Sequence, residues 1–475
     1  MRTSVVLTII AALIALVVVI FAGSLLINPN RALLAGVEFA PSTISPNADG
    51  SDDVALIRYE LSENALVSIF LEDEQGDRYY FRENEIRATG DYEVQFSGVV
   101  DGYVLPGEDI NGEILRRLIP DGDYIWTLVA VSQDSGEEMT ASGQLQIIDA
   151  NVALPEITEF TVFPEIFTPN QDGIADRTQV NVGLVKDSDL QVYLLNEDDE
   201  RIYMARREEG RDEGEAGRHW YDYEGGVDIG ADPPPDGDYT VVAVAQDAEG
   251  QVIRVTAPLS IQDGGKPRAE IMPQPSGATV IFDVMPYDER YFSSLTVTGD
   301  LVPVPTDPDA LTVTDITMPI GDMLVFKLTV NNYGRAPIRT SGPWPGTVYQ
   351  QGQPDAALGW YQRSGVWRVG IQCETSGEDY PWRWAIGSPD TLQQETAADG
   401  EIFYYLSPGE QSVTWGAIRM TDIIATQNPQ RCWAGLIHED VNVSQLNTNV
   451  GPRMIELVDP FVEVQPEVEE NTDSD

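Results

Sequence analysis

The chain of 475 residues contains few of the side chains that most metal centres and many active sites require. It has two histidines and two cysteines, which makes a zinc cluster, a disulfide-dense scaffold and most histidine-based catalysis improbable. Three of the 28 basic residues are lysine, the acidic residues number 78, and the formal net charge is −50. Because contacts to phosphate need a basic face, this charge excludes nucleic acid as a partner.

The acidic excess has several physical consequences. Carboxylates on an exposed surface favour solubility and the binding of divalent cations, and they repel anionic polymers at low salt. Life at high salt would favour the same composition, so composition alone does not separate these explanations.

Motifs of known catalytic machinery are missing. The sequence contains no Gly-x-Ser-x-Gly, no phosphate-binding loop and no His-Glu-x-x-His, which are the patterns of common hydrolases, nucleotide-binding proteins and metalloproteases. We therefore expect no enzyme, no catalytic residue and no required cofactor.

One long apolar run lies near the N-terminus. Residues 5–27 carry no charge, and a helix of this length extends roughly 34 Å, enough to span a bilayer core. A cleaved signal peptide usually has a shorter apolar region, so residues 1–35 are expected to form an uncleaved signal-anchor, although cleavage stays open. Arg2 precedes the run and favours an inside N-terminus. We expect a single-pass protein of the cell membrane, with the bulk of the chain outside the cytoplasm.

Beyond residue 35 the pattern is that of β-structure. Short alternating runs rich in Val, Thr, Tyr and Leu are separated by Gly, Pro, Asp and Asn, as in residues 124–131 and 239–245. Strands of this length and spacing predict antiparallel β-sandwiches.

An internal repeat organises the first half of the chain. The pattern Ser/Thr-Pro-Asn-x-Asp-Gly-x-x-Asp occurs at 45–53 and again at 168–176, and Pro-Asp-Gly-Asp-Tyr occurs at 120–124 and at 235–239. Repetition at this period indicates tandem modules. We assign a first module to residues 36–150 and a second to 151–263.

These repeated motifs carry a resemblance to a known family. They resemble the Ig-like domain of flagellar hook-capping proteins, and also the Ig-like modules that end gliding-motility-associated bacterial surface proteins. The resemblance implies two Ig-like sandwiches. The first copy departs from the pattern at residues 125–126 and in an insertion near 101–118. The resemblance implies little about function, because such modules serve as spacers, adhesive units and sorting domains.

The third region has a different composition. Seven of the nine tryptophans lie between Trp344 and Trp433. Residues 326–334 and 406–410 resemble the asparagine-x-glycine and proline-glycine-glutamate pattern of generic bacterial Ig-like domains. We expect a linker at 264–296, a Trp-rich sandwich at 297–458 and a disordered acidic tail at 459–475.

The two Asn-x-Asp-Gly loops are candidate calcium sites, because calcium loops place oxygen ligands at alternating positions and a glycine at the sharp turn. The bidentate glutamate that usually closes such a loop is missing, so an Asx-type turn that starts a strand is the alternative. The possible ligands are Ser45, Asn47, Asp49 and Asp53 in the first loop, and Thr168, Asn170, Asp172 and Asp176 in the second.

The two cysteines, Cys373 and Cys432, lie in the same predicted domain. In an exported domain an isolated pair is most simply one disulfide. Two buried free thiols are the alternative.

The tryptophans of the third region allow two interpretations. Trp344, Trp382 and Trp384 could stack on a glycan or peptide ligand, and they could equally fill the core of a Trp-rich sandwich.

Three functions are compatible with the sequence. The first is a membrane-anchored structural or adhesive surface protein, whose modules contact other envelope proteins or glycans. The second is a ligand-binding accessory subunit of an envelope or secretion machine. The third is an unrecognised hydrolase in residues 297–458.

Overall fold

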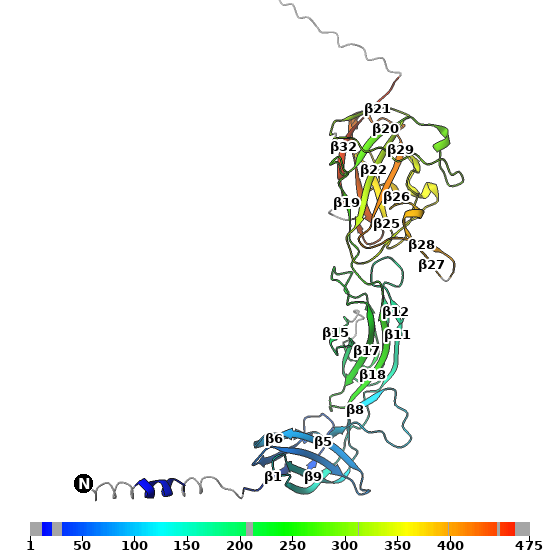
Figure 1. Cartoon of the computed structure of the whole chain (residues 1–475). Helices are drawn as coiled ribbons and strands as arrows, with labels where there is room; N and C mark the ends of the chain where they lie inside the picture. The colour runs from blue at the N-terminus through cyan, green and yellow to red at the C-terminus, as the bar shows by residue number, and fades with distance from the viewer. Residues whose placement is uncertain are drawn as a thin grey trace, which may run out of the picture. The chain divides into compact units, whose positions relative to one another are not determined.

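The computed structural model describes residues 12–20, 31–205, 212–311, 313–397, 399–443 and 447–460. Beyond residue 31 the regular elements are strands and short 3-10 turns, as the sequence predicts (Figure 1). Residues 12–20 are helical, and the rest of the predicted membrane segment 5–27 lies outside the described residues. No helix within the described ranges is long and apolar enough to cross a bilayer.

The first module is a sandwich of two sheets. One sheet has the order β1-β3-β6 and the other β2-β10-β9-β4-β5. The strands are β1 (Leu34–Ala40), β2 (Thr43–Ile44), β3 (Ala55–Leu61), β4 (Ala65–Glu72), β5 (Arg78–Arg87), β6 (Gly90–Phe96), β9 (Gly122–Ser132) and β10 (Glu138–Ile147).

The core of this module follows from the alternation of its strands. Successive side chains of a strand point to opposite faces, and in β9 the residues Tyr124, Trp126, Leu128 and Ala130 are buried while their neighbours are more exposed. The ring of Trp126 stacks on Phe39 of the other sheet, with ring centroids 4.2 Å apart. The period-2 pattern of the sequence therefore marks the core correctly.

The insertion in the first copy has a structural role that the sequence did not predict. It forms a hairpin of β7 (Val99–Asp101) and β8 (Glu113–Leu118), and β8 pairs antiparallel with β18 (Val252–Ile261) of the second module. The backbone amide of Leu118 also donates to Oε1 of Gln251 at 3.2 Å. The first module thus extends a sheet of the second.

A polar cluster holds the chain segment between these two modules. Lys186 Nζ lies 2.8 Å from Asp247 Oδ2 and 2.7 Å from Glu249 Oε2, and it donates to the carbonyl oxygen of Ala153 at 3.1 Å. The Nε2 group of Gln251 donates to the same carbonyl oxygen at 2.8 Å. Because both carboxylates are buried, their pairing with Lys186 satisfies charges that would otherwise be costly.

The second module repeats the plan of the first. In both copies a two-residue strand after the cis X-Pro bond pairs parallel with the last long strand, β2 with β10 and β12 with β18. Its sheets have the orders β11-β13-β16 and β15-β14-β17-β18-β8-β7. The remaining strands are β11 (Ile157–Phe163), β12 (Ile166–Phe167), β13 (Thr178–Leu184), β14 (Asp189–Leu195), β15 (Arg201–Tyr203), β16 (Gly217–Tyr223) and β17 (Gly237–Gln246).

By their contacts, the residues form two compact units. Unit 1 contains the chain up to Thr161 with Asn181–Tyr221 and Thr240–Ala257, and unit 2 contains Val162–Val180, Asp222–Tyr239 and the chain from Pro258 onward. The hairpin and the Lys186 cluster belong to unit 1. The second Asn-x-Asp-Gly loop and the third domain belong to unit 2.

The predicted linker at 264–296 is wrong. Strands β19 (Ala269–Met272) and β20 (Ile281–Met285) lie within it, and both pair antiparallel with β22 (Met323–Asn332). Together they pair with the edge of β22 that β29 leaves open. The short runs between Pro and Gly residues did not indicate these strands. The third domain therefore begins near residue 269.

The third domain is also a two-sheet sandwich. Its sheets have the orders β19-β22-β29-β24 and β21-β32-β30-β25-β23-β28-β27, with β20 on β22, β26 on β25 and β31 on β30. Its other strands are β21 (Ile316–Pro319), β23 (Ile338–Thr340), β24 (Val348–Gln350), β25 (Trp367–Cys373), β26 (Trp382–Ala385), β27 (Gln393–Thr396), β28 (Ile402–Leu406), β29 (Gln411–Arg419), β30 (Gln430–His438), β31 (Asn442–Val443) and β32 (Val450–Val458).

The two sequence patterns of this domain meet at one buried residue. Asn332, at the end of β22, donates from Nδ2 to the carbonyl oxygens of Ala336 and Leu406, both at 2.9 Å. Its backbone amide donates to Glu410 O, and its carbonyl oxygen accepts from the amide of Gly409. The Asn-x-Gly turn and the Pro-Gly-Glu turn are therefore joined by the asparagine that begins the first pattern.

Candidate functional site

The first Asn-x-Asp-Gly loop is closed by its own side chains. Asn47 Oδ1 accepts from the backbone amide of Asp49 at 3.1 Å, as in an Asx turn. The carboxylate of Asp53 accepts from the amides of Ala48 at 2.9 Å and Gly50 at 2.7 Å. The carboxylate of Asp53 is thus the hydrogen-bond acceptor for these backbone amides.

The second loop has the same internal bonds. Asn170 Oδ1 accepts from the amide of Asp172 at 3.0 Å, and Asp176 Oδ2 accepts from the amide of Gly173 at 2.6 Å. Asp172 Oδ1 accepts from the amide of Ile174 at 2.8 Å. The repeated motif therefore codes for one turn structure, made twice.

This geometry corresponds to the turn interpretation of the loops. Ser45 and Thr168 close each loop with a backbone bond, to Asp52 O and Ala175 O respectively, both at 2.8 Å. The described part of the chain holds no group of three or more His, Cys, Asp or Glu residues placed to bind a metal. The calcium expectation for the two loops gains no support from their geometry.

The second loop packs closely against the third domain within unit 2. A Cβ atom on Gly173 would lie 2.2 Å from the carbonyl oxygen of Ser364, and one on Gly365 would lie 2.1 Å from the carbonyl carbon of Asp172. The hydroxyl of Tyr405 donates to Asp172 Oδ2 at 3.1 Å. Both glycines are required because their backbones touch, and both have positive φ angles of 83° and 77°.

Burial at this contact shifts the titration of two side chains in opposite senses. Desolvation raises the pKa of Asp172 to about 6, with the nearby Asp176 carboxylate adding to the shift. Desolvation lowers the pKa of His438 to about 4, although its Nε2 donates to Gln171 O at 2.7 Å. Burial also lowers the pKa of Arg339. The raised pKa of Asp172 and the lowered pKa of His438 predict opposite effects of pH on the stability of the fold.

We expect two substitutions at this contact to change the pH dependence with opposite signs. A raised carboxylate pKa gives stability that is present below pH 3.8 and lost as the pH rises through about 6, whereas a lowered histidine pKa gives stability present above 6.5 and lost as the pH falls toward 4. When the pH is lowered from 7.5 to 5, the free energy of unfolding of Asp172→Asn should therefore fall by about 1 kcal/mol relative to that of wild type. That of His438→Gln should rise by about 2 kcal/mol relative to wild type.

The measurement is urea unfolding of each variant and of wild type at both pH values. Comparison within each pH removes the general effect of the chain's acidic charge. Changes of the same sign in the two variants would contradict the burial of these groups.

The two cysteines form a disulfide in the third domain. Cys373 of β25 and Cys432 of β30 lie opposite each other in the strand register, with sulfur atoms 1.98 Å apart and a sequence separation of 59. Both side chains are buried in the core. The bond joins neighbouring strands of the larger sheet.

Two of the three tryptophans proposed to stack on a ligand belong to the core instead. Trp382 is 3% exposed and Trp384 is fully buried, so neither presents a ring to solvent. Trp384 packs edge-on against Phe326 and Tyr349, and its Nε1 donates to the carbonyl oxygen of Thr347 at 3.0 Å. The ligand-stacking prediction is wrong for these two residues because the side of β26 that carries them points into the core.

The third, Trp344, lines a pocket of about 350 Å³ on the third domain. Its ring contacts that of Trp360 at nearly a right angle, with centroids 6.3 Å apart and planes at 79°. One side of Trp344 packs on the core. The full lining is Ser293, Ser294, Val297, Thr298, Gly299, Leu301, Pro343, Trp344, Thr347, Leu358 and Trp360.

Three loops without β-structure form the walls of this pocket, and one buried arginine holds two of them. Arg368 on β25 is fully buried, and its Nε donates to Ser341 O, just before the Trp344 loop, at 2.8 Å. Its Nη1 lies 2.6 Å from Asp355 Oδ2, and its Nη2 donates to Tyr361 O at 2.8 Å. These last two contacts flank the segment that carries Trp360. Arg368 is thus a positioning residue for the pocket.

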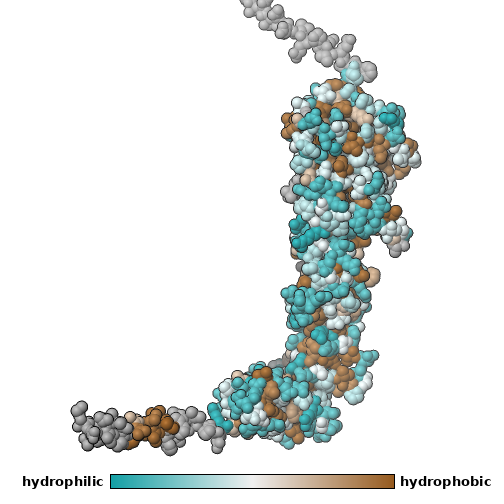
Figure 2. Space-filling view, viewed as in Figure 1, coloured by the Kyte–Doolittle hydropathy of each residue, from teal (hydrophilic) through white to brown (hydrophobic). Residues whose placement is uncertain are grey.

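The apolar surface continues on the rim. Leu295 and Leu301 are 66% and 53% exposed, and Val297 is 47% exposed. A Cβ atom on Gly359 would lie 3.0 Å from Leu295 Cδ1, which places this leucine beside the Trp360 loop. In Figure 2 hydrophobic residues interrupt the hydrophilic surface of the third domain. Clustered exposed apolar side chains are typical of binding surfaces.

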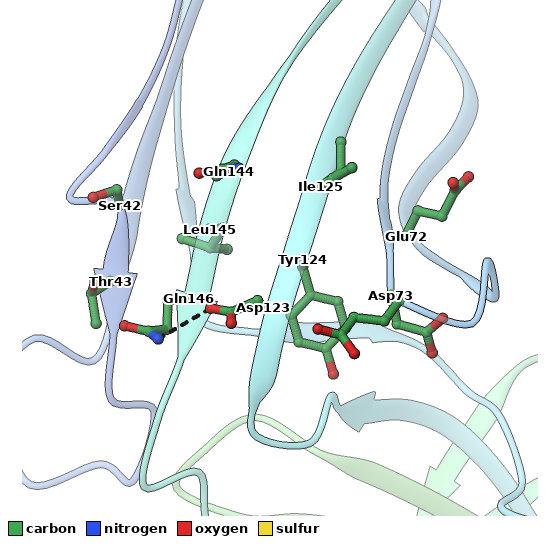
Figure 3. Close-up of a pocket in the computed structure, with 11 residues that line it drawn as sticks. Ser42, Thr43, Glu72, Asp73, Asp123, Tyr124, Ile125, Gln144, Leu145 and Gln146 are labelled. Atoms are coloured by element: carbon green, nitrogen blue, oxygen red, sulfur yellow. Dashed lines mark hydrogen bonds between the residues drawn. The ribbon is translucent and has the colours of Figure 1, made fainter.

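A larger pocket lies in the first module, over the ends of β2, β10, β9 and β4 (Figure 3). Its volume is about 470 Å³, and its lining is polar and acidic, with Glu72, Asp73, Glu74 and Asp123. Two of these carboxylates already accept hydrogen bonds within the module. Asp73 accepts from the Tyr79 hydroxyl and Asp123 accepts from Gln146 Nε2, both at 3.1 Å. Acidic residues alone do not define a site, so the Trp-lined pocket is the better candidate.

Comparison with known proteins gives fold neighbours only. No protein-family model and no curated protein matches the chain. Among solved structures, the chain is similar to a tetra-tandem repeat in the extending region of a large adhesion protein, at 13% identity over 86% of this chain and 72% of that one, with a TM-score of 0.15.

It is also similar to two other solved structures. One is titled as an insight into host cell surface retention of a 1.5-MDa bacterial ice-binding adhesin, at 11% identity over 82% of this chain and 99% of that one, with a TM-score of 0.16. The other is SGBP-B of a Bacteroides ovatus mixed-linkage glucan utilization locus with a heptasaccharide, at 10% identity over 90% and 71%, with a TM-score of 0.15. Because all three TM-scores lie far below 0.5, the argument about function rests on the site itself.

Proposed function

We propose that the chain is a membrane-anchored, non-enzymatic surface protein whose tandem Ig-like modules carry an adhesive third domain. The contacts would be made to proteins or glycans of the cell envelope. The observation that carries this proposal is the apolar pocket of Trp344 and Trp360, two of whose loops are held by the fully buried Arg368. Concave apolar sites with a few polar groups are the usual form of binding sites.

The location and the module type have separate support. The uncharged run at 5–27 would anchor the chain, and the Cys373–Cys432 disulfide fits an oxidising compartment. The repeated tyrosines each donate to a carbonyl four residues upstream, Tyr124 to Pro120 at 2.9 Å and Tyr239 to Pro235 at 2.7 Å. Such tyrosine corners are typical of Ig-like sandwiches.

Retention of cells under flow tests the adhesive role. Cells that display the full chain should be held on a surface coated with envelope glycans and proteins, and Trp360→Ala should reduce retention several-fold at equal display. Trp220→Ala is the matched control, because Trp220 is 40% exposed on β16 of unit 1. Equal retention of the Trp360 variant and wild type would overturn the proposal. Retention that requires a second envelope protein would identify the chain as an accessory subunit instead.

The topology gives a further prediction. Protease added to intact cells should remove the residues after about residue 35, because the folded modules would lie outside the membrane. The check is mass spectrometry of the fragment that remains with the cells, with lysed cells as the control. Full protection of the modules until lysis would contradict export, and with it the surface function.

A further inference from the structure

We propose that the Trp344–Trp360 pocket binds the ring of a neutral carbohydrate. This inference rests on the proposed function, in which the pocket is the contact site, and it names the class of ligand. Two features of the lining carry it: a corner of two indole rings, and hydroxyl groups without any charged side chain.

The two indoles form a corner that can hold one face of a sugar ring. Their planes meet at 79°, with centroids 6.3 Å apart. A sugar ring has an apolar face of C–H bonds that can lie on one indole, while the second indole closes the side of the ring. Leu358 and Leu301 extend the same apolar wall. Burial of these C–H groups against aromatic carbon provides the apolar part of the affinity.

The hydroxyl groups of the lining offer hydrogen bonds of both kinds. Ser294 Oγ accepts from the amides of Thr296 at 3.4 Å and Val297 at 3.2 Å, so its O–H remains able to donate. Thr347 Oγ1 donates to Trp344 O at 2.7 Å, so its lone pairs remain able to accept. Because a sugar hydroxyl both donates and accepts, this pair matches it, whereas a purely aliphatic group would leave both unused.

The charge of the site selects a neutral ligand. The residues that line the pocket include no Asp, Glu, Lys, Arg or His, so an anionic sugar would find no partner for its charge. The chain's net charge of −50 repels anions further at low salt. Burial of an unpaired carboxylate is costly, and uronic and sialic acids should therefore be disfavoured.

The corner is held in place before a ligand arrives. Arg368 binds the Asp355 carboxylate before Trp360, the carbonyl oxygen of Tyr361 after it, and the carbonyl oxygen of Ser341 ahead of the Trp344 loop. Gly359, with φ of 84°, ends the 3-10 turn η2 (Asp355–Leu358) directly before Trp360. A lining fixed in this way loses little conformational entropy on binding.

The test is binding of oligosaccharides to the full chain in lipid nanodiscs, measured by titration calorimetry and tryptophan fluorescence. The probes are neutral hexose and N-acetylhexosamine oligomers, and matched oligomers that contain uronic or sialic acid. We expect at least one neutral series to bind, with affinity reduced tenfold or more in Trp360→Ala, partly restored in Trp360→Phe and unchanged in Trp220→Ala. Anionic oligomers should bind at least tenfold more weakly.

Two outcomes would overturn this inference. The first is binding of anionic oligomers equal to that of neutral ones. The second is no saturable binding of any neutral oligomer, whether or not N-acetyltryptophanamide, an aromatic peptide probe, binds in a Trp360-dependent way. The second result would reject a sugar ligand and leave the adhesive function intact, because retention under flow tests that function separately.

Discussion

Replacement of Arg368 by methionine is expected to destabilise the third domain by about 3 kcal/mol, because it removes the ion pair with Asp355 and leaves the carbonyl oxygens of Ser341 and Tyr361 without this donor. Asp355 Oδ2 lies 2.6 Å from Arg368 Nη1, whereas the buried Glu439, 3.5 Å from the same nitrogen, keeps Arg383 Nη1 as a partner at 2.9 Å. Denaturant unfolding followed by tryptophan fluorescence reports this directly, since seven of the nine tryptophans lie in the third domain. The loss of the Ser341 and Tyr361 contacts should also loosen the pocket.

Arg363→Met is the matched control. Arg363 pairs with Glu401 on the surface, where both side chains are more than a third exposed. Exposed ion pairs contribute about 0–1 kcal/mol, so this variant should unfold near the wild-type denaturant concentration. Equal stability of the Arg363 and Arg368 variants would contradict the buried role of Arg368.

Removal of the disulfide is the second change with a large expected effect. The double substitution Cys373→Ala and Cys432→Ala opens a loop of 59 residues in the unfolded chain. The chain-entropy account gives a cost of about 4 kcal/mol at 25 °C. Alanine is chosen because both positions are buried and apolar, so that no hydroxyl is left without a partner.

Wild type in the presence of reductant is the reference for this prediction. Its unfolding midpoint should fall toward that of the double variant, and the double variant itself should not respond to reductant. Unfolding of the double variant at the wild-type midpoint under non-reducing conditions would show that the bond adds no stability.

Much of the fold could be predicted because it depends on local pattern. The alternation in β9 and the repeated loop at 45–53 and 168–176 are read from neighbouring residues, and the structure places them as strands and matching turns. The pairing of β8 with β18 could not be predicted in this way, because it joins residues about 140 positions apart. Nothing in the sequence near 101–118 distinguishes a surface insertion from a strand that extends a neighbouring sheet.

The candidate site was predicted only in part. Trp344 was identified, but Trp382 and Trp384 were grouped with it, since alternation alone does not tell which face of a strand is the core. Arg368 was missed, although a single charged residue within the otherwise apolar start of β25 is a usable signal. Burial on both faces of β25 explains why an arginine there must be paired.

Hydroxyl-radical footprinting of the displayed full chain, free and attached to its surface, tests the central claim most directly. The claim is that the third-domain pocket is the contact site. Attachment should protect Leu301, Trp344 and Trp360 from oxidation, and leave the exposed Ile86 and Tyr203 of unit 1 oxidised as before. Protection of Ile86 and Tyr203 with the pocket residues still fully oxidised would contradict the account.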